Sequence, residues 1–444
     1  MAVLAFVLLV IVAPPALAAP GDIDSSFGSG GRVRTDFAGF FDIANDALVQ
    51  GNGRVVAVGQ AATGTTFGSN DFAIARYTAG GDPDPAFSGD GRQRTDFSGM
   101  GDTAEAVAQQ DDGKLVAAGS SETAAGGRFA LARYTTNGHL DTTFSGDGKV
   151  RTAFPGFDST SAADVAVQGD GRIVAVGNAI FVPQAPGPGG TRGGPGVVSD
   201  VAVARYKPNG SLDPAFGGGD GLVTTDFGGA FDLGSAVTFL PSGAILVAGL
   251  SQTPALEQRL IAVRYLSNGT RDGSFSGDGK VVVDMVAGES ESVAGLAVRP
   301  DGRIVIGGTA HNAVTGSSGA DLAVLRLKAN GGVDATFGGG DGKAFADFGG
   351  SEDPDTMLRQ DDGKLVFVAT RPPPQTQTQA IWVFRLTGAG APDTGFGAGG
   401  RAKVEFSDSV GGFGGALDQS GRIVAVGRVG IGSDGDFAAT RLEG

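Results

Sequence analysis

The sequence contains no cysteine, only two histidines and a single tryptophan among 444 residues. Without cysteine the chain cannot form disulfides, use thiol chemistry or carry a lipid on a cysteine. His139 stands in the turn "NGHLD" and His311 in a loop of different sequence, which argues against a paired histidine or histidine–metal site. Trp382 has no aromatic partner motif, so a stacking platform for sugars is not indicated.

Positive charge is also scarce, because 33 lysines and arginines are outnumbered by 48 acids and the net charge is −15. Nucleic acids and anionic membranes are bound by basic faces, so we expect neither as a partner. After the first residues no apolar run is long enough for a membrane anchor. Glycine is abundant instead, with 79 residues placed between short apolar runs, as in turns.

The one long apolar stretch lies at the start of the chain. Residues 1–19 read "MAVLAFVLLVIVAPPALAA" and end in Ala16-Leu17-Ala18, the small-residue pattern of a cleavage site. No lysine or arginine precedes the stretch, and cleavage after Ala18 or after Ala19 fits equally well. The pattern predicts a signal peptide over 1–19, a mature domain over 20–444, and a secreted, periplasmic or extracellular location.

A unit of about sixty residues recurs seven times. Each copy has a motif phenylalanine, a glycine in a "DGR"-like turn, and an arginine followed by tyrosine or leucine. The phenylalanines are Phe27, Phe87, Phe144, Phe216, Phe275, Phe337 and Phe396. Because the three markers agree on the count, the repeats form a regular array.

Each copy holds four short strand-like runs. In the first copy these are "ANDALVQ" (44–50), "RVVAVGQ" (54–60), "FAIARY" (72–77) and "GRQRTDF" (91–97). The second and third runs are almost wholly apolar, as in strands covered on both faces, whereas the fourth alternates as an edge strand does. No stretch has a convincing helical period. The pattern predicts an all-β, seven-bladed β-propeller with four-stranded blades.

The two ends of the chain are complementary. An isolated fourth run, Gly31–Phe37, begins the mature chain, and a third run without a fourth, Phe437–Leu442, ends it. We therefore expect these two runs to pair and close the ring. A solenoid, the alternative, would need atypical capping repeats at its ends. The third copy also carries a Gly- and Pro-rich insertion, Pro183–Ser199, which we expect to be a mobile loop.

The unit "LDxxFGxGDGxV…DGRIVAVG…ARY" resembles the delta-60 repeat family of bacterial proteins. The resemblance extends over residues 21–444 and implies a propeller-type fold. The family has no general biochemical activity, so the resemblance transfers no catalytic residue.

An aspartate precedes each motif phenylalanine by three residues. These are Asp24, Asp84, Asp141, Asp213, Asp272, Asp334 and Asp393. The last six each follow an arginine by eight residues, namely Arg76, Arg133, Arg205, Arg264, Arg326 and Arg385. The constant spacing predicts an ion pair that braces a turn, and closure of the ring would pair Asp24 with Arg441.

The alternative for these aspartates is a ring of metal ligands. The nearest partner acid is the aspartate of "GDG", which Gly30 and Gly399 replace in two copies. Aspartate and glycine share a tolerance for positive φ, so this position indicates a turn. Tyrosines follow the arginine at Tyr77, Tyr134, Tyr206 and Tyr265, but Leu327, Leu386 and Leu442 replace them elsewhere, which indicates packing.

A second set of acids follows the fourth run of each copy. It consists of Asp42, Asp102, Asp158, Asp232, Glu289, Asp353 and Asp408. If the first run is innermost, these acids crowd the channel mouth and form an acidic rim that attracts cations. Ca²⁺, which takes oxygen ligands, is the cofactor that such a rim would bind. The alternative is that the acids face water and keep the protein soluble.

Two functions remain open. The first is an exported binding or scaffold module, whose protein, glycan or small-molecule ligand binds the face formed by the variable loops. The second is a secreted carboxylate-dependent lyase or hydrolase acting at the channel mouth. A cluster of histidines or arginines in the variable loops would favour the enzyme, and the sequence shows none. We therefore favour a monomeric binding protein with no assignable catalysis over the enzyme, and the enzyme stays open as the alternative.

Overall fold

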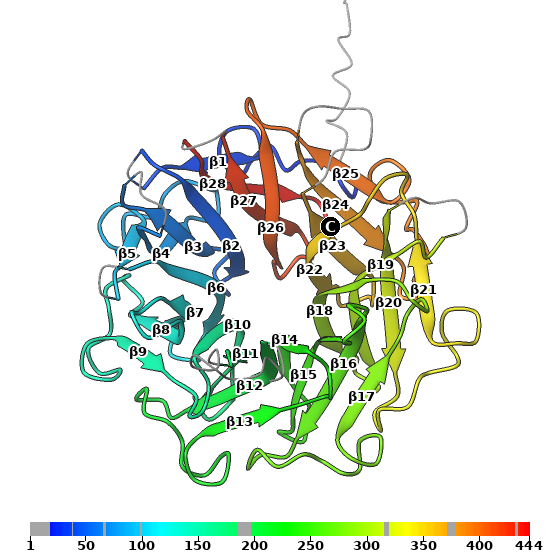
Figure 1. Ribbon diagram of the computed structural model, residues 1–444. Helices are drawn as coiled ribbons and strands as arrows, with labels where there is room; N and C mark the ends of the chain where they lie inside the picture. The colour runs from blue at the N-terminus through cyan, green and yellow to red at the C-terminus, as the bar shows by residue number, and fades with distance from the viewer. Residues whose placement is uncertain are drawn as a thin grey trace, which may run out of the picture.

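The computed structural model describes residues 18–37, 39–64, 68–97, 100–183, 197–314, 319–370, 379–430 and 434–444. Within these ranges the chain forms 28 strands and no helix. The strands surround a central opening (Figure 1). Among the residues described, we find no helix with the length and apolar character needed to span a bilayer. Most of the signal peptide expected over 1–19, and residues 184–196 of the expected insertion, lie outside the described residues.

The strands form four concentric sets. The innermost set is β2 (Asp42–Val49), β6 (Asp102–Gln109), β10 (Ser159–Val167), β14 (Phe231–Phe239), β18 (Glu291–Val298), β22 (Pro354–Arg359) and β26 (Val410–Leu417). The second set is β3 (Val55–Ala62), β7 (Leu115–Ser121), β11 (Ile173–Phe181), β15 (Ile245–Gln252), β19 (Ile304–His311), β23 (Leu365–Ala369) and β27 (Ile423–Val429).

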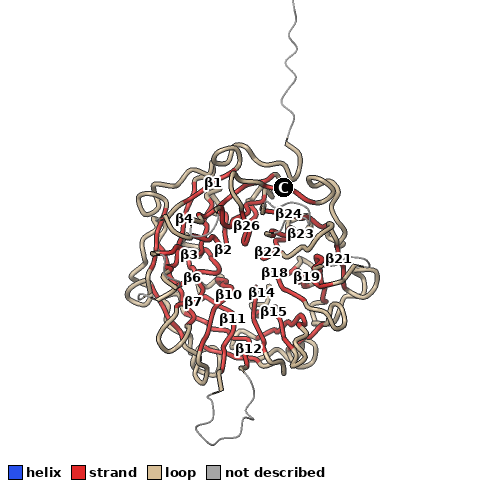
Figure 2. The backbone as a smooth tube through the Cα atoms, turned by 45° about the horizontal axis from the view of Figure 1, so that its top comes forward, coloured by secondary structure: helices blue, strands red, loops and turns tan. Residues whose placement is uncertain are grey.

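The third set is β4 (Asn70–Tyr77), β8 (Arg128–Tyr134), β12 (Val198–Tyr206), β16 (Gln258–Tyr265), β20 (Ala320–Leu327), β24 (Ile381–Leu386) and β28 (Asp436–Leu442). The outermost set is β5 (Arg92–Thr95), β9 (Lys149–Thr152), β13 (Leu222–Thr225), β17 (Lys280–Val283), β21 (Lys343–Ala346), β25 (Arg401–Val404) and β1 (Arg32–Thr35). In Figure 2 the innermost strands lie around the opening and the loops lie toward the outside. Val198 and Ser199 belong to β12, so the expected insertion is too long at its C-terminal end.

Five sheets have four strands, and one has eight. The eight-stranded sheet consists of the groups β10–β13 and β14–β17, which a single parallel bridge between Ser199 and Phe231 joins. The sheet β1-β28-β27-β26 combines the two ends of the chain. In it β1 runs antiparallel to β28, with Arg32 opposite Thr440 and Thr35 opposite Phe437. This is the pairing that the complementary ends of the sequence predict.

Every innermost strand has a register shift, as between Ala44 and Asp46 in β2. The shift admits an extra residue and bends the strand. It also brings backbones close together, because a Cβ on Gly59 of β3 would lie 1.8 Å from the carbonyl oxygen of Ile43. The glycine of the recurring "VAVG" run is therefore required by this close approach.

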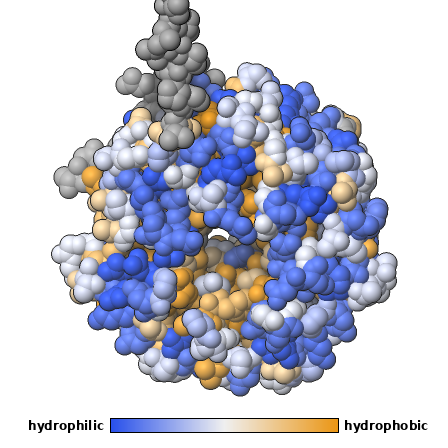
Figure 3. Space-filling view, turned by 180° about the vertical axis from the view of Figure 1, so that it is seen from behind, coloured by the Kyte–Doolittle hydropathy of each residue, from blue (hydrophilic) through white to orange (hydrophobic). Residues whose placement is uncertain are grey.

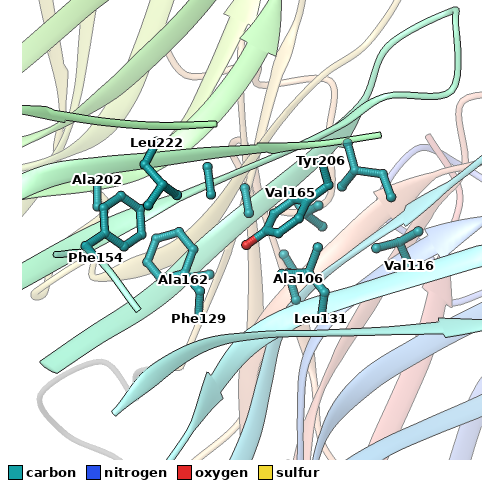
Figure 4. Close-up of a cluster of buried hydrophobic side chains, with 14 of the residues drawn as sticks. Ala106, Val116, Phe129, Leu131, Phe154, Ala162, Val165, Ala202, Tyr206 and Leu222 are labelled. Carbon is teal, nitrogen blue, oxygen red and sulfur yellow. The ribbon is translucent and has the colours of Figure 1, made fainter. Parts of the chain in front are cut away.

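The hydrophobic core is divided among neighbouring four-stranded groups. One cluster joins Phe129 and Leu131 of β8 to Ala162 of β10 and Tyr206 of β12, as Figure 4 shows. Strands of the second and third sets are buried along most of their length, which agrees with their apolar sequences. The core thus lies between successive groups, and each group depends on its neighbours for burial.

Candidate functional site: the central channel

A cavity of about 600 Å³ occupies the centre of the molecule. Residues from all seven innermost strands line it, and most of them stand at or beside the register shifts. The space-filling view from behind shows an opening at this place, bordered by both hydrophilic and hydrophobic residues (Figure 3). A central cavity lined by every repeat is the default place to seek a ligand site.

Four acids line this cavity, and we call them the channel acids: Asp46 of β2, Glu105 of β6, Asp164 of β10 and Asp355 of β22. Asp46 Oδ2 accepts a hydrogen bond from the Val107 amide at 2.9 Å. Asp164 Oδ2 accepts one from the Val237 amide at 2.7 Å. Each donor lies on the next innermost strand, so these two acids connect neighbouring strands while their carboxyl groups border the cavity.

The environment of the channel acids opposes their ionisation. Burial, which outweighs the Val107 hydrogen bond and is reinforced by the charge of Asp164, raises the pKa of Asp46 to about 7. Burial also raises the pKa of Asp164 to about 6 and that of Glu105 above its ordinary value. Among the described residues that line the cavity there is no lysine, arginine or histidine. A bound cation would therefore supply the positive charge that the lining of the cavity lacks, and would favour the ionised form of the channel acids.

The sequence prediction missed the channel acids, because it sought functional acids in the loops. A usable indication was present in "ANDALVQ" and "AADVAVQ", where an aspartate stands within a strand-like run. The second and third runs of each of these repeats, by contrast, are almost wholly apolar and have no acid in their interior. His139 and His311 are both exposed and neither lines the cavity. Trp382 is only 8% exposed.

The acids expected to form one rim do not occupy equivalent positions. Asp42, Asp102 and Asp232 are buried within innermost strands, where they accept hydrogen bonds from the amides of Phe37, Phe97 and Phe227. The corresponding buried acids of the fifth and sixth repeats are Glu291 and Glu352 rather than Glu289 and Asp353.

The remaining rim acids have other surroundings. Asp158 is exposed and accepts a hydrogen bond from the Val182 amide at 2.7 Å. Glu289 accepts one from Asn312 at 3.0 Å, and Asp408 pairs with Arg34 at 3.1 Å. Asp353 is exposed. The loop lengths differ between repeats, so equal distance from a strand end does not give equal placement.

All seven Arg–Asp pairs of the sequence pattern lie within ion-pair distance, with N–O separations of 2.7 to 2.9 Å. Asp24 and Arg441, from opposite ends of the chain, are separated by 2.7 Å. Within each pair the other aspartate oxygen accepts the backbone amide two residues later, as Asp141 does from Thr143 at 3.0 Å. In Asp141, one carboxylate oxygen thus accepts a local amide and the other forms the ion pair with Arg133.

The arginines of these pairs make further contacts that the sequence did not indicate. Each guanidinium lies over the motif phenylalanine, as Arg133 does over Phe144 at 4.6 Å. Among the described residues, five of the seven arginines also donate to a backbone carbonyl of the next repeat, as Arg76 does to Thr136 at 2.6 Å. The motif phenylalanine and the constant aspartate therefore share one partner, and that partner connects successive repeats.

Five of the brace aspartates, Asp24, Asp141, Asp213, Asp272 and Asp334, have a pKa below the ordinary value. Although burial raises it, hydrogen bonds from Thr143 and the charges of Arg133 and Lys114 lower the pKa of Asp141 to about 2. A second cation from the "DGR"-like turn approaches most of these aspartates, as Arg54 does Asp84 at 2.9 Å. These aspartates are therefore paired with cationic side chains, as the brace interpretation expects.

The tyrosines that follow the arginine are packing residues with a satisfied hydroxyl. Tyr77, Tyr134, Tyr206 and Tyr265 each share a hydrogen bond of 2.7 to 2.8 Å with a threonine of the outermost set. These threonines are Thr35, Thr95, Thr152 and Thr225. Where leucine replaces the tyrosine, the outermost residue is Val283, Ala346 or Val404. The polar pair is thus kept or lost as a unit.

Comparison with known families supports the propeller-type repeat. Residues 50–87, 110–144, 189–216, 240–275 and 299–337 match the family model described as "Domain of unknown function (DUF5122) beta-propeller". The matched segments each contain parts of successive repeats. A search of the curated proteins found no match.

Several solved structures match this chain at low sequence identity. The polysaccharide lyase Uly1 has a TM-score of 0.52 and 11% identity, over 96% of this chain and 97% of that chain. A protein of unknown function from Dyadobacter fermentans has a TM-score of 0.48 and 13% identity, over 93% and 98%. The β-propeller domain of the trilobed protease from Pyrococcus furiosus has a TM-score of 0.42 and 10% identity, over 91% and 96%. At such identities the first likeness shows the fold alone. The chain is an all-β protein with β-propeller repeats of a kind whose function is not known.

Proposed function

We propose that this chain is a closed seven-bladed propeller of the delta-60 repeat type, exported as a monomer, that works as a binding module. The seven copies of the repeat and the pairing of β1 with β28 support the closed ring. The apolar stretch over 1–19 supports export. Fractionation of cells expressing the full chain or residues 20–444 tests the location: only the full chain should leave the cytoplasm.

The ligand that the channel fits best is a small organic molecule with primary amino groups. The observation that carries this proposal is the set of channel acids around one cavity of about 600 Å³, with no positive side chain among its described lining residues. An ammonium group donates three hydrogen bonds and carries the missing charge, so it would hold Asp46 and Asp164 in their ionised form.

Thermal shift with putrescine and spermidine tests this ligand class, since binding to the folded state raises Tm by mass action. We expect Tm to rise with either amine and not with butanediol, which has the same length without charge. Asp46→Asn and Asp164→Asn should each weaken the shift, and Asp111→Asn, an exposed turn residue with the same charge change, should not. Equal shifts in all variants would contradict the proposal.

A carboxylate-dependent lyase or hydrolase is the second candidate. The near-neutral pKa values of Asp46 and Asp164 suit general acid–base chemistry. A lyase also needs a group that stabilises the anion of its substrate, and no arginine, lysine, histidine or tyrosine is among the described lining residues. We therefore favour binding. Incubation with uronate-containing polysaccharides should give no increase in the ultraviolet absorbance of unsaturated products, and an increase lost in Asp46→Asn would establish the enzyme instead.

A further inference from the structure

Four groups of three carboxylates lie where one four-stranded group meets the next, and we call them junction triads. In each triad, the first acid belongs to a strand of the third set. The second acid follows the strand of the outermost set that pairs with it. The third acid lies at the start of the next innermost strand or just before it. The triads are Asp36/Asp42/Asp436, Asp71/Asp96/Asp102, Asp200/Asp226/Asp232 and Asp321/Asp347/Glu352. In each triad, one oxygen per residue lies within 4.8 Å of the others. None of these residues lines the central cavity.

The innermost acid of every junction triad has a buried oxygen without a hydrogen bond of normal geometry, although the Ser121 and Ser251 hydroxyls lie near enough to Asp102 and Asp232 to oppose the rise that burial causes in the pKa of each. These atoms are Asp42 Oδ1, Asp102 Oδ1, Asp232 Oδ1 and Glu352 Oε2. The side chains belong to residues that are 0%, 1%, 0% and 4% exposed. In the three aspartates the other oxygen already accepts a backbone amide. An unpaired carboxylate oxygen in the interior costs free energy that a bound cation would recover.

The third triad shows the imbalance of charge most clearly. Within the described residues, Asp200, Asp226 and Asp232 form no ion pair with a lysine or arginine. Neutral oxygens adjoin the unpaired atom, because Asp232 Oδ1, Ser251 Oγ and the Gln252 carbonyl surround the space beside Gly229. A Cβ on Gly229 would lie 2.7 Å from Asp232 Oδ1 and 2.5 Å from Ser251 Oγ. The glycine thus leaves room among oxygen atoms, which are the ligands that hard cations take.

The fifth repeat provides an internal comparison, since Arg259 stands where the four junction triads have the third-set aspartate. There Glu291 Oε2 accepts the Leu260 amide at 2.8 Å. Glu291 Oε1 accepts the amides of Met285 and Val286, so both oxygens have partners. The arginine lies 3.9 Å from Asp284, the acid after the outermost strand. At this junction the innermost acid has no unpaired oxygen, whereas in the first triad Asp42 Oδ1 is unpaired although Arg34 pairs with Asp436.

The other two junctions lack both the third-set acid and the innermost acid. Arg128, Ala153 and Thr160 occupy the three positions at one of them, and Thr160 Oγ1 there accepts the Phe129 amide at 3.1 Å. Ala380, Glu405 and Val410 occupy them at the other, where Val410 is buried and Glu405 pairs with Lys403 at 2.5 Å. Among the described residues, the unpaired innermost oxygen thus accompanies the third-set aspartate and is missing without it.

We propose that the four junction triads are divalent-cation sites, and that Ca²⁺ is the ion they select. Ligand sets made only of carboxylate, hydroxyl and carbonyl oxygens favour Ca²⁺ over transition metals. The bound ion would neutralise three converging charges and fasten each innermost strand to the preceding four-stranded group. These sites are separate from the channel and do not depend on the amine ligand proposed for it.

Calorimetric titration of Ca²⁺ into the chelator-treated full chain tests the sites, with Mg²⁺ in a parallel titration. We expect about four Ca²⁺ ions per chain, weaker binding of Mg²⁺, and a Tm that rises with Ca²⁺ and falls with chelator. Absence of both heat and Tm shift would show that the triads hold protons instead, and would overturn the proposal. Binding of Mg²⁺ as tightly as Ca²⁺ would overturn the choice of ion.

Two variants locate the ions. Asp226→Asn changes an exposed member of the third triad, so the protein should fold, and the stoichiometry should fall from about four to about three. Asp200→Asn should have the same effect. Asp111→Asn, with the same charge change on an exposed turn, and Asp46→Asn in the channel should leave the stoichiometry unchanged. An unchanged stoichiometry in both triad variants would contradict the proposal, provided that circular dichroism shows native sheet content.

Discussion

Two kinds of buried aspartate can be compared in this protein, the brace aspartates and the innermost acids of the junction triads. Asp24 is 7% exposed and Asp42 is 0% exposed, so burial hardly distinguishes them. Asp24 receives Arg441, Arg422 and the Ser26 amide, whereas Asp42 has one oxygen on the Phe37 amide and the other unpaired. Burial raises the pKa of both, but only Asp24 has enough donors to bring its pKa below the ordinary value. The number of donors therefore separates a structural acid from a candidate binding acid.

The largest effect should come from breaking the seam brace. Arg441→Ala would leave Asp24 buried with its main partner gone, and such a loss costs about 3–5 kcal/mol in the free energy of unfolding. Urea unfolding of the full chain measures it. Arg441→Lys should recover only part of the loss, because lysine cannot reproduce the fork of the guanidinium. A loss below about 1 kcal/mol for Arg441→Ala would show that Arg422 can replace the brace.

The pH dependence of stability should separate the channel acids from the braces. Asp46 and Asp164 have raised pKa values of about 7 and about 6, so the folded state holds protons that the unfolded state has released. Their contribution to stability is therefore complete below about pH 4 and is lost as the pH rises through 6 to 7. Asp141, with a pKa of about 2, acts oppositely and loses its contribution as the pH falls from about 4 through 2.

We thus expect maximal stability near pH 4 to 5 in metal-free buffer, with a decrease on the order of 1–3 kcal/mol by pH 8. Unfolding midpoints in urea across this range provide the measurement. Asp46→Asn, which cannot ionise, should flatten the decrease, while Asp111→Asn should leave it as it is. A stability that rises between pH 5 and 8 would mean that the channel acids do not control this range.

A smaller effect is expected at the shared tyrosine–threonine hydrogen bond. Tyr134→Phe would leave the buried Thr95 hydroxyl without its partner and should cost about 1–2 kcal/mol. Combining Tyr134→Leu with Thr95→Val copies the Leu327 and Val283 pair of the fifth repeat. The double variant should be more stable than the sum of its single variants predicts, by about 0.5–2 kcal/mol. Simple additivity would contradict the view that the two residues act as one unit.

The smallest effect should come from the second cation of a brace. Arg54 is 39% exposed in its side chain and lies 2.9 Å from Asp84, which Arg76 already neutralises. Because exposed ion pairs are screened by water, Arg54→Ala should cost less than about 1 kcal/mol. Arg76→Ala in the same brace is the matched comparison and should cost several times more. Similar losses for both would mean that burial of the partner does not set the strength of the pair.

The sequence by itself determined the features that depend on local spacing. The four runs per repeat, the constant interval between arginine and aspartate, and the complementary ends can all be read from residues close to one another or in periodic order. The Arg–Asp pairs were predictable because a short turn joins their strands, so eight residues always span the same distance. The pairing of Asp24 with Arg441 followed from the same interval once the two ends were joined.

Only the tertiary structure decided which acids share a site. Asp200, Asp226 and Asp232 come from three strands or their ends, and whether their carboxylates meet depends on how one four-stranded group packs on the next. Likewise Asp46 and Asp164 border one cavity because register shifts turn their strands at that depth. Loop lengths vary while packing distances do not, and for that reason counting from strand ends placed Asp42 and Asp158 together although one is buried and the other exposed.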